Sequence, residues 1–80
     1  MPRKIRDLIR DLRDAGFVQL KNRGEGDHAV YRFNDRPEIT VVLDGRPGDD
    51  AQHYQEKQIR EAIRKARAAA TLVNDYLNRE

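Results

Sequence analysis

The spacing of apolar residues changes twice along this chain of 80 residues, and this change restricts the folds that it can adopt. Near the start, apolar residues recur at intervals of three and four, which predicts an amphipathic helix over residues 3–15. This apolar stripe consists of Ile5, Leu8, Ile9 and Leu12. Pro2 is typical of a helix start, and Gly16 suits the left-handed position after a helix end. Helical spacing returns at about residue 52 and predicts a second helix to about residue 77.

Between the two helical patterns, three short segments have the composition and spacing of β-strands. These segments are residues 17–21, 28–33 and 39–43. Side chains alternate between the two faces of a strand. One face of the middle segment therefore carries Ala29, Tyr31 and Phe33, and the other carries His28, Val30 and Arg32. Because the connections are short, the three strands are expected to pair as an antiparallel meander.

Turn-forming residues separate these strands at residues 22–27 and 34–37. A third irregular stretch, residues 44–50, contains two glycines and a proline and leads into the second helix. Asp49 or Asp50 is expected to cap that helix, because a short carboxylate side chain can accept hydrogen bonds from its free N–H groups.

Two amphipathic helices and a three-stranded sheet can bury their apolar surfaces if both helices cover the same face of the sheet. We therefore expect an α+β fold with the order helix–strand–strand–strand–helix, as in double-stranded-RNA-binding-like folds. Without a linker or an internal repeat, residues 1–80 are expected to form one domain. Its core should span about residues 4–67, with residues 68–80 as an extension of the last helix.

The composition excludes several classes of protein and of site. The chain has no cysteine, so it can form neither a disulfide nor a thiolate metal site. It has no serine to serve as a nucleophile, and no apolar run long enough for a membrane span or a signal-peptide core. These features suit a cytoplasmic protein. Sixteen basic residues face fourteen acidic ones, so the net charge of +2 does not by itself indicate a nucleic-acid-binding protein.

Motifs for common cofactors are also missing. The sequence has no phosphate-binding loop of the GxxxxGK[ST] type, and its Gly24-x-Gly26 pair lacks a third glycine and does not lead into a helix. The only histidines, His28 and His53, are 25 positions apart and do not have the spacing of metal ligands. We therefore expect no cofactor and no metal site. His53 is expected to pack or cap at the start of the last helix.

His28 is the strongest candidate for a catalytic residue in this sequence. It follows a loop that contains glycines, and Asp27 beside it would favour the imidazolium form. Lys21, Arg23 and Arg32 are close to it in sequence. Cleavage of an RNA phosphodiester uses such a set, because a histidine can take the proton of a 2′-hydroxyl while cations stabilise charge on the phosphate. The same pattern also fits a surface histidine at a strand end.

The last helix carries a possible phosphate-binding stripe. Lys57, Arg60 and Arg64 are spaced at i, i+3 and i+7, so they lie along one side of a helix. Phosphate contacts along an RNA backbone would use such a row of cations. The alternative is an ordinary solvated helix face.

Taken together, four segments of the chain resemble the HicA toxins of bacterial toxin–antitoxin systems. In order, they are KIRDLIRDLRDAGF, RGEGDHAVYRF, ITVVL and GDDAQHYQEKQIREAI, and the resemblance covers about residues 4–66. It implies a double-stranded-RNA-binding-like fold, metal-independent endoribonuclease activity on mRNA, and a HicB-type antitoxin that blocks the active site. The catalytic histidine of the family corresponds to His28, and the glycine of its motif to Gly26. Glu25 occupies the position of a frequent lysine, and Asp27 that of the commoner serine.

Two other functions remain open. The two carboxylates in this motif would repel a phosphate, which favours a non-catalytic RNA-binding module on the same fold. The long last helix could instead serve a protein-interaction domain, either in a homodimer or in a permanent complex with an antitoxin.

Overall fold

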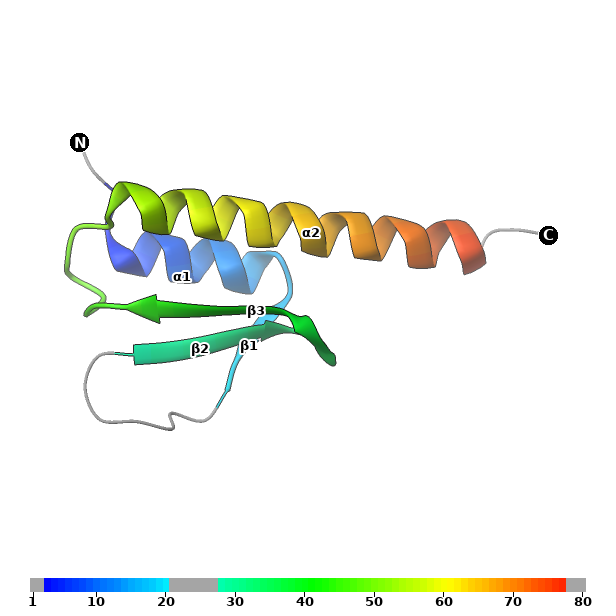
Figure 1. Cartoon of the computed structure of the whole chain (residues 1–80), viewed down its shortest axis with the longest axis horizontal. Helices are drawn as coiled ribbons and strands as arrows, with labels where there is room; N and C mark the ends of the chain where they lie inside the picture. Colours follow the sequence, from blue (N-terminus) through cyan, green and yellow to red (C-terminus); the bar gives the residue numbers. More distant parts are fainter. Residues whose placement is uncertain (1–2, 21–27, 78–80) are drawn as a thin grey trace.

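The computed structural model describes residues 3–20 and 28–77, with side chains described as far as residue 71. Helix α1 spans Ile5–Asp14 and helix α2 spans His53–Leu77 (Figure 1). Between them lie strands β1 (Phe17–Gln19), β2 (His28–Phe33) and β3 (Arg36–Asp44). The strands form an antiparallel sheet in the order β1-β2-β3. The expected α+β class and antiparallel meander are therefore confirmed.

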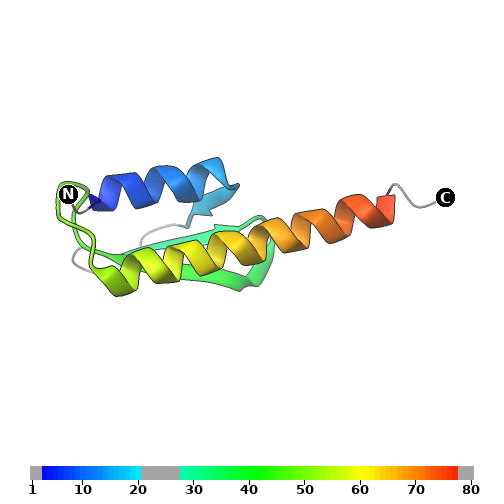
Figure 2. The same ribbon diagram turned by 90° about the horizontal axis from the view of Figure 1, so that it is seen from above.

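Both helices cover the same face of the sheet (Figures 1 and 2). The alternation expected for β2 is confirmed, because Tyr31 and Phe33 are buried beneath the helices. The core also takes three residues from α1, one from β1, three from β3 and three from α2: Ile5, Leu8, Leu12, Phe17, Ile39, Val41, Leu43, Ile59, Ala62 and Ala66. The opposite face of the sheet is left uncovered within the described part of the chain.

Three strand boundaries differ from those expected, the smallest difference being that β3 ends at Asp44 and not at Leu43. Strand β1 ends at Gln19, although the N–H of Leu20 still donates a hydrogen bond of 2.8 Å to the carbonyl of Val30. Strand β3 begins at Arg36, so the connection after Phe33 is tighter than the turn expected over residues 34–37. Asn34, with a φ of 52°, adopts the left-handed conformation that a tight turn requires. Pro37 is tolerated in β3 because this strand lies at the sheet edge and beside a register irregularity.

The expected ends of α1 and α2 are largely confirmed. Gly16 follows α1 with a φ of 100°, which is the left-handed conformation expected after a helix end. At the other end, Asp7 accepts a hydrogen bond of 3.0 Å from the N–H of Lys4, and this bond lowers the pKa of the Asp7 carboxyl. Helix α2 ends at Leu77 and projects well beyond the sheet and α1 (Figures 1 and 2). Pro2 lies outside the described residues.

The expectation that Asp49 or Asp50 caps the last helix is wrong. The loop that carries them instead closes the start of α1, where the N–H of Ile5 donates to the carbonyl of Asp49 at 2.9 Å. The Asp50 carboxylate pairs with Lys4, also at the start of α1. At the start of α2, the N–H of Gln52 donates instead to the side-chain oxygen of Gln55 at 2.8 Å.

Within the described residues, neither helix combines the length and the apolar character that a membrane crossing requires.

Candidate functional site

His28 lies at one end of the β2–β3 ladder, on the sheet face that the helices leave uncovered. Its Nδ1 atom pairs with Oδ1 of Asp44, the last residue of β3 and the cross-strand partner of His28. The side chains of His28 and Asp44 are 58% and 53% exposed. A substrate can therefore reach the imidazole ring while the carboxylate holds it.

This pairing assigns different roles to the two ring nitrogens. A carboxylate accepts hydrogen bonds and cannot donate them, so the ring hydrogen of a neutral His28 lies on Nδ1. The Nε2 atom then keeps its lone pair and can take a proton from a hydroxyl group within hydrogen-bond reach. A histidine oriented by a carboxylate is a common arrangement for acid–base catalysis. Asp27, the carboxylate expected here from the sequence, lies outside the described residues.

The middle of the uncovered face is apolar. Val18 and Val42 are 52% and 48% exposed. Val30 lies directly opposite Val42, whereas Val18 lies opposite Arg32. Arg32 is on the same face but four residues along β2 from His28, a separation of about 13 Å. Its Nε atom donates to the carbonyl of Asn34 at 3.3 Å. The structure therefore puts Arg32 on the expected face, at a distance from the imidazole.

Three of the other residues predicted to bind RNA near His28 cannot be placed. Lys21, Arg23 and Gly26 all lie outside the described residues.

Lys57, Arg60 and Arg64 lie on α2, which covers the other face of the sheet from His28. With His53 and Glu61 they line a hollow of about 230 Å³. Within the described part of the chain none of these three cations has a carboxylate partner, whereas Arg3 and Arg10 of the α1 region are paired with Asp11 and Asp7. The expected stripe therefore exists as exposed, unpaired charge, but the structure does not bring it to His28.

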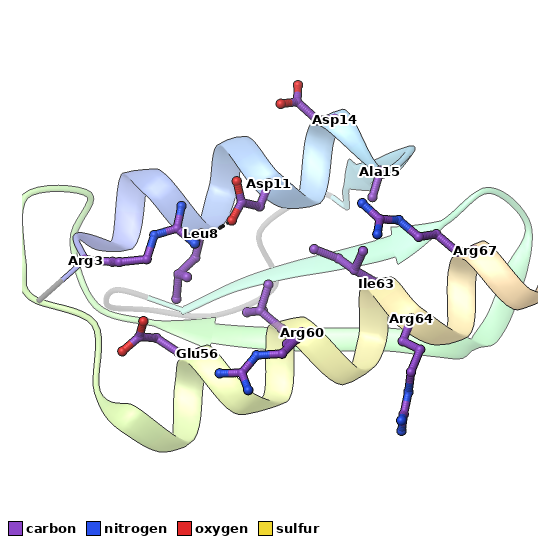
Figure 3. Close-up of a pocket in the computed structure, with 11 residues that line it drawn as sticks. Arg3, Leu8, Asp11, Asp14, Ala15, Glu56, Arg60, Ile63, Arg64 and Arg67 are labelled. Carbon is purple, nitrogen blue, oxygen red and sulfur yellow. Dashed lines mark hydrogen bonds and ion pairs between the residues drawn. The ribbon is translucent and has the colours of Figure 1, made fainter.

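A larger groove of about 810 Å³ runs between α1 and α2 (Figure 3). Its apolar lining residues are Leu8, Ala15, Ile59 and Ile63. Its charged lining residues are Arg3, Asp11, Asp14, Glu56, Arg60, Arg64 and Arg67. Arg3 and Asp11 are joined by an ion pair of 2.6 Å, and Arg64 points away from α1. Because both signs of charge line it, the groove does not select one class of ligand.

Among the described residues, no three histidine, aspartate or glutamate side chains gather into a group that could hold a metal ion.

Comparisons with protein-family models, with curated proteins and with solved structures find no match for this chain.

Proposed function

We propose that the chain is a HicA-like endoribonuclease that cleaves mRNA, with His28 as general acid or base and with a double-stranded-RNA-binding-like fold. The observation that carries this proposal is the pairing of His28 with Asp44 on an uncovered sheet face. The order of elements and the placement of both helices on one face also agree with such a fold. The resemblance of four segments to HicA toxins supplies the substrate class.

In the proposed reaction, Nε2 of His28 takes the proton from a ribose 2′-hydroxyl. The 2′-oxygen then forms a bond to the adjacent phosphorus atom as the bond from phosphorus to the 5′-oxygen breaks. The leaving 5′-oxygen takes a proton from water. The products are a 2′,3′-cyclic phosphate and a 5′-hydroxyl end. Lys21 and Arg23 are the proposed source of positive charge for the reacting phosphate, with Gly26 allowing close approach of the backbone. Arg32 lies too far along β2 from His28 to contact that phosphate.

The 2′-hydroxyl requirement provides a direct test. We expect the purified protein to cleave an RNA oligonucleotide and to leave a 2′,3′-cyclic phosphate, which mass spectrometry distinguishes from a linear phosphate. A matched oligonucleotide with 2′-deoxyribose at the cleaved position should remain intact at that position. Cleavage of this deoxy substrate at the same phosphate would contradict the mechanism.

A HicB-type antitoxin is the proposed protein partner. The exposed Val18 and Val42 side chains lie on the same sheet face as His28. A protein that covered this face would bury apolar surface and block access to the imidazole at the same time. The cytoplasm, where mRNA is translated, is the proposed site of action.

A second candidate function is non-catalytic binding of an RNA backbone to α2. The observation that favours it is a row of exposed cations on α2 that have no carboxylate partner among the described residues, on the other side of the sheet from His28. Like charges at such spacings on a helix repel one another, and Glu61 in the same hollow offsets only part of this repulsion. Bound phosphates would relieve the rest. This function requires only charge and does not depend on the pairing of His28 and Asp44.

The two functions respond differently to removal of charge from α2. We expect the double variant R60Q/R64Q to weaken binding to single-stranded RNA and to lower the slope of log affinity against log salt by about 1.4, since each phosphate contact contributes about 0.7. Filter binding at several salt concentrations measures this slope. The matched control R6Q/R13Q removes the same charge from exposed positions of α1. Equal slopes for both double variants would reject α2 as a specific phosphate-binding surface.

A further inference from the structure

Gln55 is the one buried polar side chain among the described residues, with 4% of its surface exposed. It belongs to the first turn of α2, and both ends of its amide group have partners. Its oxygen accepts the N–H of Gln52 at 2.8 Å, and its Nε2 atom donates to the main-chain carbonyl of Asp44 at 2.9 Å. Because a buried amide that loses its partners is costly, this arrangement restricts Gln55 to one orientation.

The bond to Asp44 joins two elements that are far apart in sequence. Asp44 is the last residue of β3, and the chain turns away directly after it at Gly45, where φ is 109°. Strand ends are prone to fraying because fewer ladder bonds hold them. The amide of Gln55 holds the main chain of Asp44 at this end, from the helix side of the sheet.

The same residue, Asp44, holds the imidazole of His28 on the opposite side of the sheet through its carboxylate. Asp44 thus links Gln55 of α2 to His28 on the uncovered face. Its main-chain carbonyl accepts the hydrogen bond from Gln55, and its carboxylate pairs with His28. A displacement of the Asp44 main chain would carry its carboxylate away from Nδ1.

We infer that Gln55 is a positioning residue for His28, because it fixes Asp44 and thereby the ring orientation and tautomer of the histidine. Its role in catalysis rests on the proposed function, whereas its effect on the tautomer of His28 does not. Gln55 itself is buried on the helix side and touches no substrate in this arrangement.

The test compares Gln55→Met with Gln58→Met, which makes the same change at an exposed position of α2. Gln55→Met keeps the length of the side chain and removes both hydrogen bonds. We expect the neutral His28 ring to shift from the Nδ1–H form toward the Nε2–H form, as measured by ¹⁵N chemical shifts of the imidazole. Gln58→Met should retain the Nδ1–H form. A folded Gln55→Met protein that also retains it would overturn the inference.

RNA cleavage provides the second measurement. We expect Gln55→Met to lower kcat by about 10- to 100-fold with little change in KM, since misplacement of a catalytic group slows the chemical step. Circular dichroism must show that the variant is folded at the assay temperature. If the wild-type protein does not cleave RNA, the proposed function fails, but the ¹⁵N measurement still decides the role of Gln55.

Gln55→Glu covers the case in which the methionine variant does not fold. In its ionised form the glutamate keeps an acceptor for the N–H of Gln52 and cannot donate to the Asp44 carbonyl, so the same change of tautomer is expected at a pH at which it is ionised. If neither variant folds, a scalar coupling between the Gln55 amide and the Asp44 carbonyl carbon is sought in the wild-type protein. Its absence overturns the inference; its presence, with loss of the Nδ1–H form in Asp44→Ala, supports it.

Discussion

Replacement of His28 with alanine is expected to slow RNA cleavage by about 10²- to 10⁴-fold, the usual contribution of a positioned acid–base group. The domain should remain folded, because His28 is an exposed residue at a strand end and contributes nothing to the apolar core. Single-turnover cleavage of an RNA oligonucleotide measures the rate, and thermal unfolding measures stability. In cells, the same substitution should relieve the growth arrest that the wild-type protein causes on expression.

The substitution Asp44→Asn tests the role of the carboxylate that pairs with Nδ1 of His28. An asparagine can present its NH₂ group to Nδ1, which would favour the opposite tautomer and place the hydrogen on Nε2. We therefore expect this variant also to cleave RNA slowly. Asp35→Asn, in the exposed turn between β2 and β3, is the matched control and should cleave at the wild-type rate. Equal growth arrest by the wild-type and His28→Ala proteins at equal expression would reject His28 as the catalytic residue.

The order and class of the elements could be predicted from the sequence because each has a clear hydrophobic period. The α1 stripe from Ile5 to Leu12 and the alternation around Tyr31 place the buried faces correctly. The ends of elements were less predictable. Asp49 and Asp50 have the side chains of helix caps, but the loop that holds them lies against the start of α1. Propensity alone does not determine which of two helix ends a loop will contact.

The partner of His28 was missed because of the strand register. Phe33 pairs with Arg36, and continuous pairing from that turn would place His28 opposite Val41. The register shift between Arg32 and Phe33 instead brings Asp44 to His28. Pro37 is compatible with an irregularity beside it, but it does not show by how many residues the register shifts.

The cations on α2 show what helical spacing can and cannot predict. Their spacing showed correctly that Lys57, Arg60 and Arg64 share one side of a helix. Spacing within one helix cannot show which face of the sheet that helix covers, so it could not separate these residues from His28. Gln55 was missed although its spacing carried a signal, because it lies four residues before Ile59 and seven before Ala62, on the stripe of α2 that is buried. Its polar side chain hid this signal, since a glutamine is usually exposed.

Replacement of Tyr31 with alanine is expected to lower the free energy of unfolding by about 3–5 kcal/mol, the usual cost of deleting a large buried ring. Tyr31 is in the central strand, beneath both helices, and only 1% of its surface is exposed. A chain of this size has a small core and a total stability of about 5–10 kcal/mol, so the loss should remove between about a third and all of this stability. Urea denaturation followed by circular dichroism measures the change.

Val42→Ala is the control from the other face of the same sheet, where the side chain is half exposed, and it should cost about 1 kcal/mol or less. Similar losses for both variants would show that the two faces do not differ in burial.

Tyr31 also provides a test by pH, since burial raises the pKa of its hydroxyl above the ordinary value. The unfolded chain then loses this proton first as pH rises, so the stability that Tyr31 contributes is complete below the ordinary tyrosine pKa and falls above it. Tyr31→Phe should remove this alkaline component while it keeps the ring in the core.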